Sequence, residues 1–272
     1  MNVLFWNIKK KDSFIKTIVD IILEEDIDLV AFAEFPEEKE EQFKNEFKKA
    51  LDDFEHLQPV KPNKIIIFYR SRQVNISNAY DGHKINVKRV KSAKDGNVYN
   101  FIFCHLRDQF STDKEQLPGF ARPIVKEILE YEKDQKNART ILCGDFNMDP
   151  FECGMLEYDC FNAMQTASLA LKGTRNIEGD PYPMFYNPTW GLMGDLHGQD
   201  VPGTFYYAPS HPIQQYWHLL DQVIIRPDVI PVFDKKQLKI VTTGRNYNLL
   251  NKNGNIDASY SDHLPIKFHL NI

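Results

Sequence analysis

Short apolar runs alternate along the chain with segments of helical periodicity. The apolar runs predict β-strands at residues 3–6, 28–35, 65–69, 98–105, 140–143, 219–225 and 264–270. Between them, apolar side chains recur every three or four positions in residues 14–22, 37–54 and 120–131, which predicts amphipathic helices. This order predicts an α/β fold in which packed sheets have helices outside them.

Residues 171–216 break this pattern. The segment is rich in Pro and Gly, shows little periodicity and predicts a long irregular loop region. It carries seven aromatic residues: Tyr182, Phe185, Tyr186, Trp190, Phe205, Tyr206 and Tyr207. Long irregular segments in compact domains are usually functional. We therefore expect either a substrate-recognition wall or a loop whose rings pin it to the core, and the sequence leaves both open.

Composition narrows the class of protein. The 272 residues have 42% hydrophobic content and no linker-like stretch, so we expect one domain over residues 1–272. Lys and Arg number 33 against 38 Asp and Glu, a net charge of −5, which requires no nucleic-acid partner. Four cysteines without a CxxC pair argue against a disulfide scaffold and a thiolate zinc site. We find no signal peptide and no membrane span, and expect a cytoplasmic protein.

Polar side chains stand at the ends of the predicted strands. In layered α/β proteins such positions converge on one crevice, where ligands bind. Asp221 differs because it lies inside an apolar run, where a carboxylate needs a buried partner. The polar residues at strand ends are Asn7, Glu34, His105, Asp145, Asn147, Asp262 and His263.

These residue types together suggest hydrolysis of a phosphate ester. Carboxylate and amide oxygens, without a Cys or His cluster, suit Mg²⁺ or Mn²⁺ better than Zn²⁺. Histidines hold protons or bind phosphate near neutral pH, and an Asp beside a His orients the imidazole. Each residue alone also has a structural explanation. An Asp or Asn after a strand often forms a turn or caps a helix.

Six segments in this order resemble the endonuclease/exonuclease/phosphatase superfamily, which includes deoxyribonuclease I-like enzymes, apurinic endonucleases, neutral sphingomyelinases and inositol polyphosphate phosphatases. The resemblance extends over nearly the whole chain. It implies a four-layer α/β sandwich, in which two central mixed β-sheets are flanked by helices. The segments are LFWNI, DLVAFAEF, FCHL, GDFNMDP, LLDQVII and SDHLPI.

The resemblance also implies residue roles. Glu34 would bind the metal ion with Asn7 beside it, and Asp262 would be a further metal or water ligand. Asp145 would orient or deprotonate the attacking water. The other implied roles are phosphate binding by Asn147, phosphate contact or base catalysis by His263, orientation of His263 by Asp221, and phosphate or leaving-group stabilisation by His105.

Two positions depart from many nucleases of this superfamily. Lys9 stands where those enzymes carry an acidic residue, and Leu219 stands where they carry an arginine. Both departures weigh against close kinship with apurinic endonucleases.

We therefore expect a metal-dependent phosphodiesterase or nuclease acting on DNA or RNA. A small-molecule or phospholipid phosphoesterase, for example of the inositol phosphate, nucleotide or sphingomyelin class, is the alternative, and the net negative charge favours it. A non-catalytic binding module on the same fold is a third hypothesis. It fits the sequence less well, because the acidic residues and the last histidine of the motifs are all present.

Overall fold

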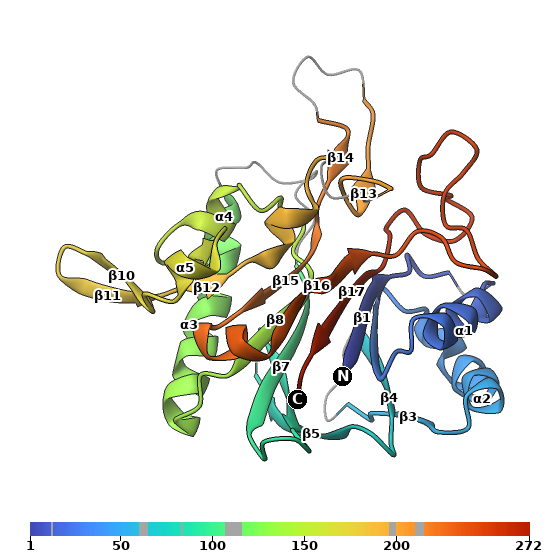
Figure 1. The fold of residues 1–272 in the computed structure, drawn as a ribbon, viewed down its shortest axis with the longest axis horizontal. Helices are drawn as coiled ribbons and strands as arrows, with labels where there is room; N and C mark the ends of the chain where they lie inside the picture. The colour runs from blue at the N-terminus through green and yellow to red at the C-terminus, as the bar shows by residue number, and fades with distance from the viewer. Residues whose placement is uncertain (12, 60–64, 83, 107–115, 196–199, 210–214) are drawn as a thin grey trace.

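Two β-sheets lie face to face at the centre of the molecule (Figure 1). The computed structural model describes the chain apart from residues 12, 60–64, 83, 107–115, 196–199 and 210–214. One sheet has the strand order β16-β17-β1-β2-β4-β3. Its strands are β16 (Phe233–Ile240), β17 (Ile266–Leu270), β1 (Asn2–Asn7), β2 (Leu29–Ala33), β4 (Ile65–Arg70) and β3 (Phe54–His56).

The second sheet has seven strands and packs against the first through contacts of β8 with β1 and of β7 with β2 and β4. Its order is β5-β6-β7-β8-β15-β12-β9. The strands are β5 (Asn75–Asp81), β6 (Asn86–Lys91), β7 (Val98–His105), β8 (Thr140–Asp145), β15 (Asp221–Ile225), β12 (Phe185–Tyr186) and β9 (Ala163–Met164).

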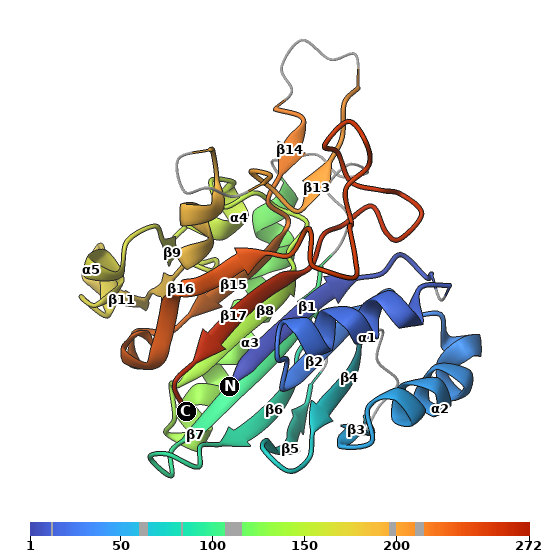
Figure 2. The same ribbon diagram turned by 45° about the vertical axis from the view of Figure 1, so that its right-hand side comes forward.

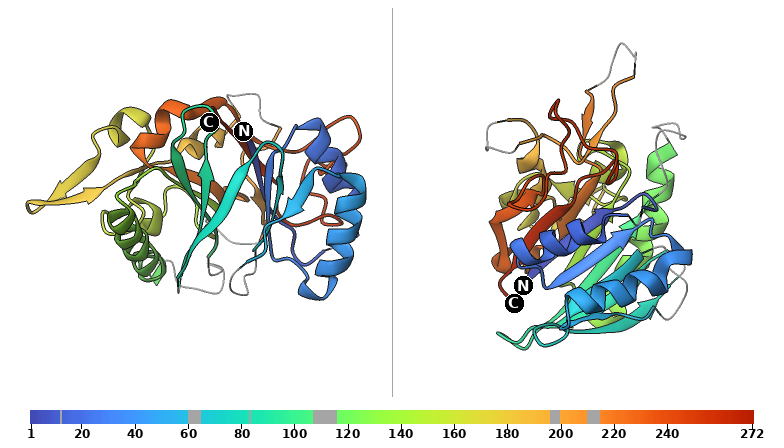
Figure 3. Two further views of the ribbon diagram at one scale, coloured as in Figure 1. Left: turned by 90° about the horizontal axis from the view of Figure 1, so that it is seen from below. Right: turned by 90° about the vertical axis from the view of Figure 1, so that its right-hand side faces the viewer.

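Helices cover the outer faces of both sheets, which completes four layers (Figure 3). Helices α1 (Ile15–Glu24) and α2 (Glu40–Ala50) lie outside the six-stranded sheet, and α3 (Leu117–Gln135) lies outside the other. The predicted four-layer α/β sandwich is thus confirmed. Shorter elements are α4 (Cys153–Leu156), α5 (Ala167–Ala170) and 3₁₀ turns at Glu37–Lys39, Pro188–Leu192 and Pro227–Val232. Among the described residues, no helix has the length and apolar character needed to cross a bilayer.

Alternating side chains of each strand build two apolar cores. On β7, Phe101 and Phe103 point into the core between the sheets, whereas Ile102 joins the second core. There it packs with Ile124 and Ile128 of α3. A strand buried on both faces appears as a continuous apolar run, which is why the sequence predicted β7 with its observed bounds.

The sequence prediction was incomplete for the polar strands. β5, β6 and β16 were not predicted, because β5 and β16 are edge strands and all three carry many exposed polar side chains. The helix predicted at residues 37–54 is shorter than expected. It follows a 3₁₀ turn, ends at residue 50 and gives way to β3.

The segment 171–216 is less irregular than expected. It contains the hairpin of β10 (Thr174–Ile177) and β11 (Asp180–Pro183), as well as β12 and the 3₁₀ turn Pro188–Leu192. Its last described strand is β13 (Phe205–Tyr206), which pairs with β14 (Trp217–His218). Residues 196–199 and 210–214 of the segment lie outside the described residues. Short strands of two to four residues leave little periodicity in a sequence, which explains why these strands were not predicted.

Strand pairing brings the predicted site residues together. β1 and β2 run parallel, with Asn7 opposite Ala33, so Glu34 follows directly beside Asn7. In the facing sheet, His105 lies opposite Asp145 and Asp145 lies opposite Asp221. Both sheets therefore present polar side chains at the same end of the sandwich.

Candidate active site

Asn7 joins the two sheets at this end. Its side-chain amide nitrogen donates to Glu34 Oε1 at 3.0 Å and to Asp145 Oδ2 at 3.0 Å. Asn7 and Asp145 are buried, whereas the Glu34 carboxylate is 30% exposed. The backbone turns sharply at Glu34, where φ is 50°, and the Glu34 carbonyl accepts from the Lys10 N–H at 2.7 Å. Two carboxylates from different sheets thus converge on one amide.

His105 faces the same two carboxylates. Its Nε2 lies 3.4 Å from Glu34 Oε1 and 3.8 Å from Asp145 Oδ2. The strand pairing of His105 with Asp145 fixes this approach. An imidazole so placed stabilises negative charge at the centre of the site and can give a proton to an oxygen bound there.

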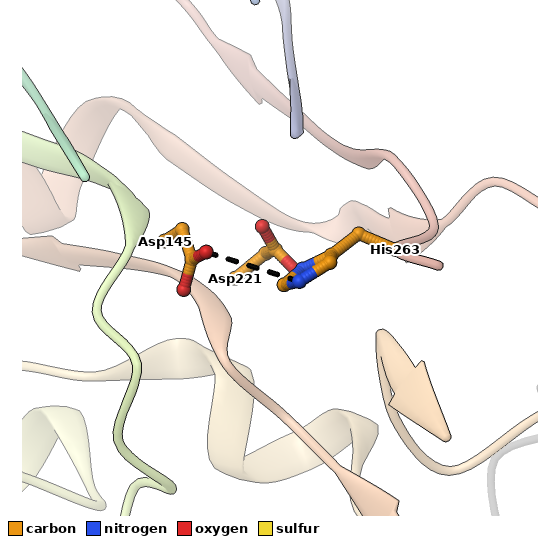
Figure 4. A group of neighbouring side chains, drawn as sticks. All are labelled: Asp145, Asp221 and His263. Carbon is orange, nitrogen blue, oxygen red and sulfur yellow. Dashed lines mark hydrogen bonds and ion pairs between the residues drawn. The ribbon is translucent and has the colours of Figure 1, made fainter. Parts of the chain in front are cut away.

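Asp221 and His263 form a buried pair (Figure 4), as the sequence predicted. His263 Nδ1 lies 2.8 Å from Asp221 Oδ2, and its Nε2 lies 3.9 Å from Asp145 Oδ2. Burial alone would lower the pKa of His263, but Asp221 and Asp145 raise it to about 10. With carboxylates facing both ring nitrogens, the imidazole is therefore a cation at neutral pH.

Asp145 is the carboxylate shared by these contacts. Burial raises the pKa of Asp145 to about 7, with His263 opposing the rise and Asp221 adding to it. Its Oδ1 accepts the Asn147 N–H at 2.9 Å. A carboxyl group with a pKa near neutrality is well matched to accepting a proton from water.

The loop that carries His263 is tied to the start of the chain. Ser261 Oγ donates to the Asn7 carbonyl at 2.7 Å and accepts from the His263 N–H at 3.2 Å. Trp6 Nε1 donates to the His263 carbonyl at 2.9 Å. These bonds hold the imidazole at a fixed position relative to Asn7.

Asn147, the predicted phosphate ligand, has an unusual backbone conformation. Its φ is 51°, and its side-chain nitrogen donates to the Leu106 carbonyl at 3.0 Å. An amide nitrogen carries two hydrogens, so a second N–H remains for a substrate oxygen.

Asp262 lies on the exposed side of this cluster. Its carboxylate forms an ion pair with the Lys9 ammonium, the residue that departs from the pattern of many nucleases. Lys9 therefore neutralises the charge of the Asp262 carboxylate, which the sequence predicted to be a metal or water ligand. The metal role of Asp262 stays a prediction.

Asp149 and His218 form a second buried pair that the sequence analysis missed. His218 Nδ1 lies 2.7 Å from Asp149 Oδ2, and Asp149 Oδ1 accepts the Leu219 N–H at 2.8 Å. Asp149 follows Asn147 within GDFNMDP, and His218 precedes Asp221 by three positions. Their closeness in sequence to predicted site residues was the signal from which this pair could have been found.

Thr204 was also missed, and its hydroxyl accepts the Asp221 N–H at 3.1 Å.

The oxygen ligands at the centre fit a hard divalent cation. Glu34 provides a carboxylate oxygen, and the Asp145 carboxylate, whose pKa burial raises, lies beside it on the same Asn7 amide. Asn7 would become a ligand by turning its amide, because its nitrogen now faces both carboxylates. Asp145, Asp221 and His263 also place ligand atoms within 4.8 Å of one another, but Asp221 and His263 already satisfy each other.

The Asp221–His263 pair gives a direct prediction for the metal-free protein. We expect Asp221→Asn to lower the pKa of His263 by at least about one unit, because the neighbouring negative charge is lost. NMR titration of the His263 ring in excess chelator measures this shift. Asp228→Asn, an exposed carboxylate on a 3₁₀ turn, is the matched control and should leave the pKa unchanged. An equal pKa in wild type and Asp221→Asn would contradict the pairing.

Similar structures share this architecture across their whole length. An endonuclease/exonuclease/phosphatase family protein from Bacteroides thetaiotaomicron superposes with a TM-score of 0.60 at 16% identity, covering 99% of this chain and 97% of its own. A mannosyl-6-phosphatase from the same species gives 0.59 at 14% identity, with 99% of each chain covered. D. rerio TDP2, complexed with a single-strand DNA product, gives 0.56 at 14% identity, covering 100% of this chain and 99% of its own.

The sequence itself matches a family over most of its length. No curated protein matches the chain significantly by sequence. The endonuclease/exonuclease/phosphatase family, by contrast, matches over residues 4–263, a range that includes every strand-end residue described above. Taken with the four-layer sandwich and the converging carboxylates, this match shows that the chain belongs to the endonuclease/exonuclease/phosphatase family.

Proposed function

We propose that this family hydrolase is a phosphodiesterase that acts on DNA or RNA with Mg²⁺ or Mn²⁺, and that residues 1–272 act as one domain. The observation that carries the proposal is the surroundings of Asp145 Oδ2. An amide lies at 3.0 Å and two imidazole nitrogens lie at 3.8 and 3.9 Å from this one oxygen. A carboxylate base surrounded by positively charged or neutral donors suits attack by water on a charged phosphate.

The proposed reaction is an in-line displacement. Asp145 takes a proton from a water molecule while the water oxygen forms a bond to phosphorus. The bond from phosphorus to the ester oxygen breaks, and that oxygen leaves with a proton that His105 donates. His263 as a cation and the second N–H of Asn147 stabilise the charge on the other phosphate oxygens.

The metal ion would be held by Glu34 and Asn7, beside the base Asp145. When bound, it would neutralise phosphate charge and polarise the phosphorus–oxygen bonds. Asp262 would add a ligand only by releasing Lys9. The four free cysteines, three of them buried, suit a reducing compartment such as the cytoplasm.

A phosphatase acting on a small phosphate monoester is the second candidate. The net charge of −5 disfavours long nucleic acids, and the similar structures include a mannosyl-6-phosphatase.

A substrate panel with Mg²⁺ separates the two candidates. It includes single-stranded DNA and RNA, plasmid DNA, nucleotides, sugar phosphates, inositol phosphates and sphingomyelin. We expect cleavage of a nucleic acid phosphodiester, with the Asp145→Asn variant as the blank. Release of inorganic phosphate from monoesters, with both nucleic acids intact, would reject the nuclease assignment in favour of the phosphatase.

A further inference from the structure

A two-stranded ribbon rises over the catalytic end of the sandwich (Figures 1 and 2). Its strands β13 and β14 are antiparallel, with Phe205 opposite His218 and Tyr206 opposite Trp217. Beyond the strands, the Tyr207 N–H donates to the Tyr216 carbonyl at 2.8 Å, which extends the pairing by one residue.

One face of this ribbon continues from the catalytic imidazole. Side chains alternate along a strand, so Phe205 and Tyr207 share a face and Tyr206 lies on the other. The Phe205 ring centroid lies 5.0 Å from that of His263 and 6.5 Å from that of Tyr207. The ring planes of Phe205 and Tyr207 differ by 29°, so they are nearly parallel. We call these two residues the Phe205 row.

The opposite face provides an internal comparison. Tyr206 packs on Trp217 there, with centroids 5.1 Å apart and planes at 61°. The two ends of the Phe205 row differ in exposure. Phe205 is partly buried against His263, whereas Tyr207 is 45% exposed. The row therefore leads from the reacting centre to solvent.

Thr204 fixes the base of the ribbon to the catalytic residues. Its hydroxyl accepts the Asp221 N–H at 3.1 Å, and its carbonyl accepts the Leu264 N–H at 2.8 Å. A β-bridge also joins Phe205 to His263 directly. The row is thus held at a set distance from the imidazole that would contact the phosphate.

We propose that the Phe205 row stacks on the nucleobase next to the scissile phosphate, and thus selects single-stranded nucleic acid. This inference rests on the proposed phosphodiesterase function. A base lies one sugar away from its phosphate, so a phosphate at His263 places the base over the adjoining rings. Aromatic faces stack on any base, which gives affinity without sequence preference. A narrow row ending in a phenol matches a flat polar ring better than an acyl chain, which needs a broad apolar surface.

Binding in excess EDTA tests the row without turnover. The probe is a fluorescein-labelled single-stranded oligothymidylate, measured by anisotropy. We expect Tyr207→Ala to weaken binding about tenfold, Tyr207→Phe to retain it because the ring remains, and Tyr206→Ala to match wild type. An abasic strand of equal length should bind more weakly and be insensitive to Tyr207→Ala. Melting temperatures show whether each variant is folded.

Kinetics with Mg²⁺ separate failure of the row from failure of the phosphodiesterase assignment. Tyr207→Ala should raise KM for the oligothymidylate about tenfold while kcat stays near wild type. If wild type cleaves the strand but Tyr207→Ala and Tyr206→Ala have the same KM and kcat, the proposed role of the Phe205 row is refuted and the phosphodiesterase assignment stands. If wild type cleaves nothing, the phosphodiesterase fails whatever the binding data show. Tyr207→Ala could instead lose binding to sphingomyelin–phosphatidylcholine vesicles while its binding to oligothymidylate is unchanged. That result would reject the nucleobase as the partner of the row in favour of a lipid surface.

Discussion

Replacement of Asp145 by Asn is expected to lower kcat by at least about a hundredfold, because the variant loses the base that takes the proton from water. The Asn amide has the size of the Asp carboxylate. Its oxygen can still accept the hydrogen bond from the Asn7 side-chain nitrogen, which is 3.0 Å long in the wild type. His263→Ala should cause a loss of at least the same order, since it removes a cation from the phosphate site. Initial rates at saturating substrate and Mg²⁺ measure both effects.

The control for these variants is a carboxylate outside the site. Asp228→Asn should keep the wild-type rate, and thermal unfolding should show that all three variants are folded. Near-normal turnover in folded Asp145→Asn would refute its assignment as the base.

Removal of divalent metal is expected to abolish turnover, and added Mg²⁺ or Mn²⁺ should restore it. The reason is the oxygen donors of Glu34 and Asn7, which lie beside the proposed base Asp145. Glu34→Gln removes one negative charge from a side chain that is 30% exposed, so the fold should survive. We expect this variant to need a higher Mg²⁺ concentration for half-maximal rate.

Two measurements would contradict metal dependence when taken together. They are full turnover in excess EDTA and the absence of tightly held metal by elemental analysis. Glu38→Gln, an exposed acid on a neighbouring 3₁₀ turn, is the matched control for charge loss and should leave the Mg²⁺ requirement unchanged.

The buried parts of the fold could be predicted from the sequence, because burial leaves a pattern. β7 is apolar on both faces and was predicted with its exact bounds. β6 and β16 could not be predicted, because their polar residues hide the strand period: Lys88 of β6 is buried, whereas Lys235 and Lys236 of β16 are consecutive and exposed. α2 was predicted too long, since Leu51 and Phe54 continue an apolar spacing after the helix has ended.

The candidate site was predictable as a set of residues but not as a geometry. Strand-end positions indicated that Asn7, His105 and Asp145 would meet, and the structure brings them together. The ion pair of Asp262 with Lys9 could not be foreseen, because it joins residues from opposite ends of the chain. The pairing of Asp149 with His218 had only a weak local signal, because 69 positions of sequence separate the two residues.

The aromatic residues of segment 171–216 divide into rings buried in the sheet and rings beside the candidate site. Phe185 and Tyr186 are buried in β12, where they anchor the segment to the sheet. Phe205 instead packs on His263, and Tyr207 extends outward from it. Composition alone could not separate these residues, since only their position on a strand decides which face each ring occupies.

Hydrolysis in ¹⁸O-labelled water tests the central claim most directly. The claim is that Asp145 activates water to attack phosphorus, with divalent metal present. Mass spectrometry of the products that wild type forms with Mg²⁺ should show one solvent oxygen in the phosphate product and none in the alcohol product. Asp145→Asn should form neither product at a rate comparable to that of wild type. Solvent oxygen in the alcohol product, or equal labelling of phosphate by Asp145→Asn at the wild-type rate, would contradict the account.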